Sequence, residues 1–227
     1  MADEEAKAVQ EASKAVGKIT EAAQQFGGFI AKYISGPLEQ GIGIYEDKLK
    51  FIRYERQLRL MKRTEELSAE YGLELPSRAL PIKIAIPIFQ AASMEEDDYL
   101  QDKWASLLIN ASNAEIKREI KRVHISILEN LSTLDVLVLD QIYSDNDDSV
   151  VEVYTKYLPQ RIEAGMAENI MEKMQDGPSE IVLSLANLAR LGCIDPSPTY
   201  GGGPSFDVVT KTALGRDFID ACRLKHQ

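Results

Sequence analysis

Four arginines recur at intervals of three and four residues and are the side chains of this sequence best suited to bind an anion. They are Arg53, Arg56, Arg59 and Arg63. In a helix this spacing places them along one side, and the planar guanidinium group matches phosphate and carboxylate oxygens. Glu55, Glu65 and Glu66 lie close enough to neutralise part of the stripe. Two interpretations stay open: a solvated, salt-bridged helix face, and a surface for an anionic partner such as a lipid headgroup or a nucleic acid.

Carboxylates gather in residues 95–98, which read Glu-Glu-Asp-Asp. Neighbouring carboxylates can perform acid–base catalysis, but they also stabilise the positive end of a helix dipole. Ser93 is followed three residues later by Glu96, which is the spacing of a capping box. The pattern therefore predicts a helix capped by Ser93, and a catalytic carboxylate cluster is the alternative.

An apolar stripe follows the carboxylates at helical spacing. It consists of Leu100, Trp104, Leu107, Leu108 and Ala111. Trp104 is the only tryptophan of the chain, and its burial should contribute about 2 to 3 kcal/mol. With Ser93 and Glu96, this stripe is the predicted structural core of the protein.

The same stretch carries a family resemblance. Residues 91–98 read Ala-Ala-Ser-Met-Glu-Glu-Asp-Asp, and residues 100–108 read Leu-Gln-Asp-Lys-Trp-Ala-Ser-Leu-Leu. Together with the proline-containing, apolar segment before them, they resemble the signature of the bacterial abortive infection alpha (Abi-alpha) family. The resemblance extends over residues 38–227 and is closest at 81–111. It implies a role in phage defence, and it implies no particular reaction.

Other residues with chemical potential do not form a recognisable site. The two histidines, His124 and His226, belong to no HExxH pattern. The acidic loop at 145–148 lacks the glycine and the final carboxylate that an EF-hand needs. Ser144-Asp145-Asn146 echoes a penicillin-binding motif, but the Ser-x-x-Lys motif that would accompany it is absent. No nucleophile-elbow or phosphate-loop motif occurs either. The sequence therefore predicts no metal, no cofactor and no enzymatic activity.

Composition narrows the classes of partner. The 36 acidic and 26 basic residues give a net charge of -10, which disfavours a broad nucleic-acid surface because phosphate binding relies on basic side chains. Cys193 and Cys222 fit a reducing compartment. The acidic start has no apolar segment of a secretory signal, and no uninterrupted span suits a membrane. We expect a cytoplasmic protein.

The N-terminal region has a heptad pattern that predicts a helix in need of a partner. Its apolar positions are Val9, Ala12, Val16, Ile19, Ala23, Phe26, Ile30 and Tyr33. The partner could be the chain itself, a second copy, another protein or an anionic membrane surface. A break is expected at Gly36-Pro37, followed by a long helix over 38–71 that Gly72 ends.

The remainder of the chain is predicted to be helical except for one hairpin. Residues 81–92 should form a helix disturbed at Pro87 that runs straight into the Trp104 helix. Ser132 and Asp135 form a second capping box. Further helices are expected over 114–129, over 150–175 with an interruption at Pro159, over 181–191 and over 212–224. Short apolar stretches on either side of a tip at 196–204 predict a β-hairpin.

The last three elements resemble a small winged-helix module. The resemblance rests on residues 188–194 and 212–218. A DNA-reading version would expose Asn187 and Arg190 from its helix. The predicted fold is mainly α: a long helical N-terminal region (1–75), a compact helical core (76–176) and the winged-helix-like module (177–227). The predicted function is a non-enzymatic, abortive-infection-type protein that acts through protein or membrane-surface contacts. A winged-helix nucleic-acid-binding regulator is the alternative.

Overall fold

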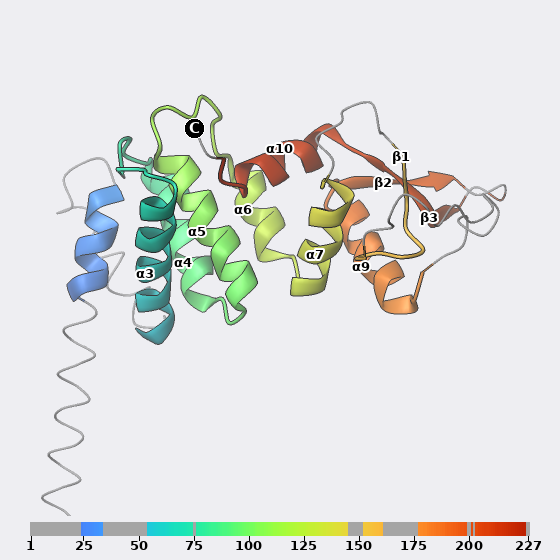
Figure 1. Ribbon diagram of the computed structural model, residues 1–227, viewed down its shortest axis with the longest axis horizontal. Coiled ribbons are helices and arrows are strands. Elements are labelled where there is room, and N and C mark those ends of the chain that lie inside the picture. Colours follow the sequence, from blue (N-terminus) through green and yellow to red (C-terminus); the bar gives the residue numbers. More distant parts are fainter. Residues whose placement is uncertain are drawn as a thin grey trace, which may run out of the picture. The chain divides into compact units, whose positions relative to one another are not determined.

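In the parts that the structure describes, the chain is mostly helical, as predicted, and carries one small antiparallel sheet in its C-terminal part (Figure 1). The computed structural model describes residues 24–33, 54–74, 76–144, 152–160, 177–198, 201 and 203–225. The predicted break at Gly36-Pro37, the acidic loop at 145–148 and the heptad positions before residue 24 lie outside these ranges.

Two compact units divide the chain. Unit 1 comprises residues up to Lys121 together with Leu224–Gln227, and unit 2 comprises Arg122–Arg223. The boundary after Lys121 lies inside the 76–176 segment that the sequence pattern treats as one core. The three-part division at residues 75 and 176 stays a prediction.

Unit 1 is a helical assembly built around three neighbouring helices. These are α3 (Tyr54–Glu70), α4 (Ile82–Met94) and α5 (Asp98–Ser112). Each contacts the other two, and Figure 1 shows them side by side. The positive φ of 67° at Gly72 ends α3, because glycine adopts this conformation without the steric cost that a Cβ brings.

A further helix over residues 24–33 packs on α4 through aromatic rings. The rings of Phe26, Phe29 and Tyr33 lie 6.1, 6.0 and 6.1 Å from the ring of Phe89. The Leu80 amide also donates to the carbonyl oxygen of Tyr33, at 2.7 Å. The heptad positions Phe26, Ile30 and Tyr33 are therefore buried within this chain, where Phe26 and Tyr33 contact α4.

The start of α5 differs from the prediction. Ser93 lies in the last turn of α4, where its hydroxyl donates to the carbonyl of Phe89. Asp97 is the N-cap of α5 and accepts from the amides of Tyr99 and Leu100, at 2.9 and 3.0 Å. The predicted Ser93–Glu96 capping box and the uninterrupted helix from 81 onward are thus both wrong. A carboxylate cap makes charge-assisted hydrogen bonds, which are stronger than those of a hydroxyl.

The segment after α5 is also not helical where helix was predicted. The structure has α6 at Arg122–Glu129, and residues 113–121 form turns and loop. The amides of Ser77 and Arg78 donate to the carbonyl of Ser112, at 3.1 and 2.8 Å. Residues that precede α4 in the chain thus supply hydrogen bonds to the last residue of α5.

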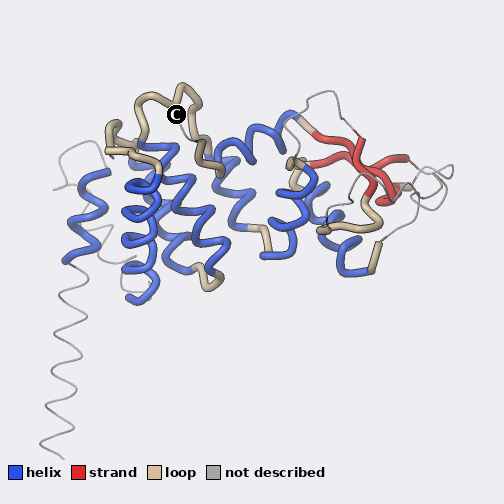
Figure 2. The backbone as a smooth tube through the Cα atoms, viewed as in Figure 1, coloured by secondary structure: helices blue, strands red, loops and turns tan. Residues whose placement is uncertain are grey.

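Unit 2 combines four helices within the described residues with the sheet. They are α6, α7 (Thr133–Ile142), α9 (Ser179–Arg190) and α10 (Ala213–Ala221). Ser132 and Asp135 form the predicted capping box at the start of α7. The strands are β1 (Glu152–Tyr154), β2 (Ile194–Pro198) and β3 (Pro204–Lys211), in the order β1-β3-β2. Figure 2 shows the strands together.

The sheet contains the predicted hairpin and one strand that was predicted as helix. β2 and β3 pair antiparallel with Ile194 opposite Lys211. β1 pairs with β3, with Val153 opposite Val209, so the prediction of helix over 150–175 is wrong at 152–154. Val153 and Tyr154 belong to residue types that favour strands, and β3 supplies the hydrogen-bonding edge that the local sequence does not reveal.

Candidate functional site

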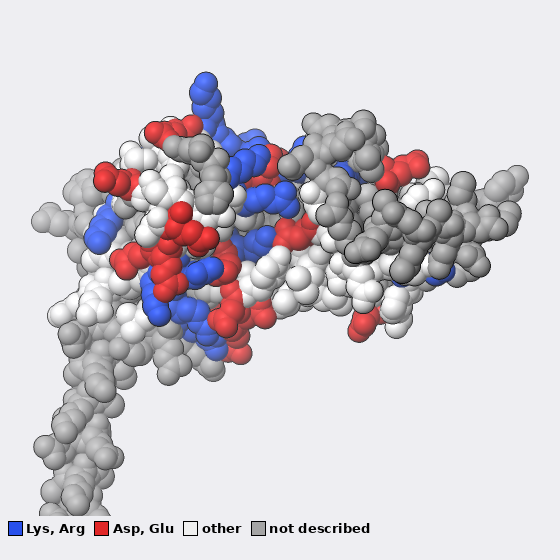
Figure 3. Space-filling view, viewed as in Figure 1, with Lys and Arg blue, Asp and Glu red and all other residues white. Residues whose placement is uncertain are grey.

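Arginines of α3 bind carboxylates and carbonyls at the start of α5. Arg56 donates through Nη1 to the carbonyl of Glu95, at 3.0 Å, and Nη2 lies 2.8 Å from Glu96 Oε1. Arg59 bonds the Asp98 carboxylate, and its Nη1 also donates to the carbonyl of Glu96 at 3.3 Å. Figure 3 shows basic and acidic side chains interleaved over this part of unit 1.

The third arginine makes the most complete contact. Arg63 donates from Nε and Nη2 to the two oxygens of Asp102, with 2.8 Å between Nη2 and Oδ2. Its Nη1 lies 3.3 Å from Glu66. The hydrogen bond to Asp102 raises the pKa of Arg63 above its ordinary value. We call the contacts of Arg56, Arg59 and Arg63 with residues 95, 96, 98 and 102 the ion-pair ladder.

The ladder lies at the surface. The Asp98 and Glu96 side chains are 91% and 70% exposed, whereas Arg63 and Asp102 are 33% and 38% exposed. Exposed pairs of this kind contribute about 0 to 1 kcal/mol each, and a two-nitrogen contact such as Arg63–Asp102 adds geometric specificity. Each pair of the ladder is therefore weak by itself, and the Arg63–Asp102 contact in addition fixes how α3 is aligned on α5.

The predicted anionic-partner residues are thus engaged within the chain where the structure describes them. Arg53 lies outside the described residues. An external anion would have to displace a carboxylate from Arg56, Arg59 or Arg63, and binding of such a partner stays a prediction. Local sequence did not point to Asp98 and Asp102 as partners, because each lies 39 positions from its arginine. The available signal was that Arg59 and Arg63 are four residues apart, as are Asp98 and Asp102.

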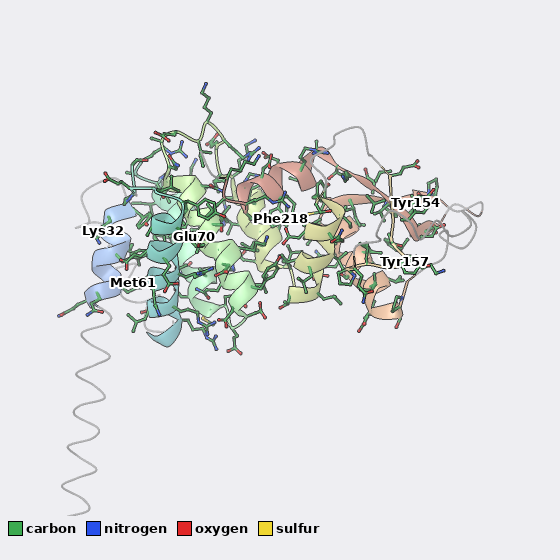
Figure 4. All side chains as sticks on the ribbon, in the orientation of Figure 1. Lys32, Met61, Glu70, Tyr154, Tyr157 and Phe218 are labelled. Carbon is green, nitrogen blue, oxygen red and sulfur yellow. The ribbon has the colours of Figure 1, made fainter. Side chains whose placement is uncertain are left out.

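The apolar stripe of α5 lies inside unit 1. Leu100, Trp104, Leu107 and Leu108 are 4%, 1%, 0% and 0% exposed. Figure 4 draws the side chains on the ribbon and labels Met61 and Glu70 on α3. The apolar residues of the family-like stretch thus build the core. Glu96, Asp98 and Asp102 take part in the ladder, and Asp97 caps α5.

Gln101 is a buried residue of α5 that the sequence pattern did not single out. It is 1% exposed, and neither its amide nitrogen nor its amide oxygen has a hydrogen-bond partner among the described residues. Gln101 lies three residues after Asp98 and four before Ala105, which places all three on the same side of α5. In the sequence, Gln101 stands out only as an uncharged polar residue next to the apolar stripe that begins at Leu100.

In unit 2, the two residues that a DNA-reading winged helix would expose contact their own chain. Asn187 Nδ2 donates to the carbonyl of Asn130 at 2.9 Å and to Asp135 Oδ2 at 3.1 Å. Arg190 Nη2 donates to Asn187 Oδ1 at 2.8 Å. These contacts tie α9 to the start of α7. The winged-helix assignment stays a prediction.

Unit 2 contains a buried histidine that contacts a carboxylate. His124 of α6 is fully buried, and its Nε2 lies 3.0 Å from Asp217 Oδ2 on α10. The described parts of the chain hold no group of three or more His, Cys, Asp or Glu side chains arranged to bind a metal. Burial raises the pKa of the Cys193 thiol to about 12. No helix in the described ranges is both long and apolar enough to cross a bilayer.

Comparison with known proteins gives one clear result. The sequence model of the family described as abortive infection alpha matches residues 55–222, which is well over half of the 227-residue chain. The curated proteins and the solved structures yield no match. The matched range includes α3, the ladder, the α5 core and the sheet of unit 2. The chain therefore belongs to the abortive infection alpha family.

Proposed function

We propose that this protein is a non-enzymatic component of phage defence that acts through contacts between its helical surfaces and another protein. Membership of the abortive infection alpha family supports the defence process. The ion-pair ladder supports the mode of action. The charged residues of the family-like stretch contact a neighbouring helix, and its apolar residues form the core. The stretch is thus engaged in arranging helices, which supports a role through surface contacts and not through a reaction of these side chains.

The partner class follows from charge. The net charge of -10 repels anionic lipid and nucleic-acid phosphates over most of the surface. The best candidates for local phosphate contacts, Arg56, Arg59 and Arg63, are already paired with carboxylates. Asn187 and Arg190 are engaged within unit 2. These observations favour a protein partner over a membrane or DNA.

Infection of cells that carry the gene tests the defence role. Expression should lower plaque formation for at least one phage in a panel, relative to an empty vector. In an abortive mechanism the culture survives when few cells are infected and collapses when all are infected at once. Unchanged plaque numbers and burst sizes across the panel would contradict the proposal, provided that the protein accumulates in soluble form.

Three binding measurements on the purified full chain test the partner class. We expect no co-sedimentation with anionic vesicles at low salt and no shift of duplex DNA. Affinity capture should recover a protein from infected cells, and the complex should reform from the two purified components. Salt-dependent binding to vesicles or DNA would overturn the assignment of a protein partner.

A further inference from the structure

The side of α3 that is buried in unit 1 contains both polar and apolar residues. The buried side of α3 alternates apolar and polar residues. Leu60 and Leu67 are buried together with Gln57, Thr64 and Ser68. In α5, four of the eleven buried residues are polar, namely Gln101, Ser106, Asn110 and Ser112, and in α4 the only polar one is Ser93. The helix that carries the arginines is thus the more polar of the buried partners.

The buried hydroxyls of α3 satisfy themselves within their own helix. Thr64 Oγ1 donates to the carbonyl of Leu60, and Ser68 Oγ donates to the carbonyl of Thr64, each at 2.7 Å. These hydrogen bonds do not depend on α5. They persist when α3 moves away, so separation leaves no unpaired hydroxyl at these two positions.

Gln101 favours separation, because its buried amide lacks partners among the described residues. A buried polar group without a hydrogen bond carries a desolvation penalty, which water removes when the group becomes accessible. Gln101 lies on the side of α5 that includes Asp98, whose carboxylate contacts Arg59. Opening of the α3–α5 contact would therefore hydrate this amide.

The ladder opposes separation, and its strength depends on salt. Its carboxylates are 38% to 91% exposed, so dissolved ions screen the pairs. The screening length falls from about 10 Å at 0.1 M salt to about 3 Å at 1 M. The α3–α5 contact thus combines exposed ion pairs, whose strength salt can change, with the buried Gln101 amide, which disfavours the contact.

We propose that α3 is a releasable helix, which the ion-pair ladder holds on α5 and which separates from it while the α4–α5 core stays folded. Release exposes the buried Gln101 amide to water and leaves the carboxylates of Asp98 and Asp102 without their arginine partners. The inference concerns the fold of unit 1 and stands whether or not the protein functions in phage defence.

Hydrogen exchange of the full chain, measured by mass spectrometry and corrected for intrinsic rates, tests this inference. In the unmodified protein, amides of α3 should exchange faster at 1 M than at 0.1 M salt. Amides of 104–111 in α5 should not follow them. A salt titration needs no variant, so it remains informative if a substitution prevents folding.

Matched variants locate the cause. Arg63→Gln removes the contact with Asp102 and should speed α3 exchange by about two- to fivefold. Lys62→Gln removes an equal charge from α3, but Lys62 pairs with Glu66 in the same helix, so α3 exchange should stay within about twofold of the unmodified protein. Gln101→Met keeps a similar shape without the amide and should slow α3 exchange by about fivefold or more.

Two results would overturn the inference. One is exchange of α3 and of 104–111 in step under all conditions, which would mean that the unit opens only as a whole. The other is α3 exchange that responds neither to salt nor to Arg63→Gln, which would mean that the ladder does not hold the helix.

Discussion

The hydroxyl of Tyr143 occupies the space that a side chain on Gly215 would need. Tyr143 Oη accepts from the amide of Thr212 at 2.9 Å and donates to the carbonyl of Cys193 at 2.7 Å. A Cβ on Gly215 would overlap both Tyr143 Oη and the carbonyl oxygen of Cys193. One hydroxyl and one glycine thus join the end of α7 to the residues just before β2 and α10.

Substitution of this glycine should destabilise unit 2. Gly215→Ala forces the Tyr143 hydroxyl or the Cys193 backbone to move, which should cost about 1 to 3 kcal/mol or more. Urea unfolding followed by far-UV circular dichroism would measure the change. Gly201→Ala is the control, because a Cβ at that position would meet no other atom within 4 Å. Equal midpoints for both variants would show that the close approach is absent in solution.

The N-cap of α5 can be tested by comparing two substitutions. Asp97→Ala removes the acceptor of two helix amides and should cost about 0.5 to 2 kcal/mol. Ser93→Ala removes only a hydroxyl that bonds its own helix, and we expect a smaller change. Fluorescence of the single tryptophan reports unfolding of unit 1. A larger loss for Ser93→Ala would reinstate the cap that the local sequence pattern predicts.

Truncation of the core tryptophan should have the largest effect in unit 1. Trp104→Ala should cost about 3 to 5 kcal/mol, because the surrounding side chains cannot fill the cavity. Tyr99→Ala on the same helix is the control, since Tyr99 is 36% exposed. Circular dichroism during urea unfolding measures both variants without the tryptophan signal. Similar midpoints for the two variants would contradict the burial of Trp104.

Alkaline pH should weaken unit 1 through Tyr33. Burial, with a smaller contribution from the charge of Glu65, raises the pKa of Tyr33 above its ordinary value of 10.0. Above pH 10 the unfolded chain therefore ionises this tyrosine before the folded chain does. The associated stability is complete below pH 10 and is lost as the pH rises further.

Comparison of unfolding at pH 8 and pH 11 tests this linkage. The urea midpoint reported by Trp104 fluorescence should fall at pH 11, and it should fall less in Tyr33→Phe. The phenylalanine variant keeps the aromatic packing against Phe89 and removes the titrating group. An equal fall in both proteins would mean that Tyr33 ionises normally in the folded state.

Several elements follow from local sequence alone. The apolar stripe of α5, the Ser132–Asp135 capping box, the end of α3 at Gly72 and the hairpin of β2 and β3 all appear as predicted. Each depends on residues that are close in sequence: within about one to four helical turns, or in two consecutive strands. Helical periodicity, cap chemistry and turn residues act over such distances, so a single sequence contains the necessary information.

Other features were decided by tertiary structure. Residues 152–154 form a strand because β3, much later in the chain, offers them an edge. Asp97 replaces Ser93 as the cap because α4 continues through Ser93, whose hydroxyl is satisfied there. Arg59 and Arg63 find carboxylates 39 positions away.

The physical reason is the same in each case. Local composition determines which groups need a hydrogen bond or an opposite charge, and it determines which residues prefer the interior. It does not determine which of several chemically equivalent partners meets that need. For the arginine stripe, a phosphate, a glutamate on its own helix and an aspartate on α5 would all satisfy the guanidinium group. The packing of α3 beside α5 brings Asp98 to Arg59 and Asp102 to Arg63.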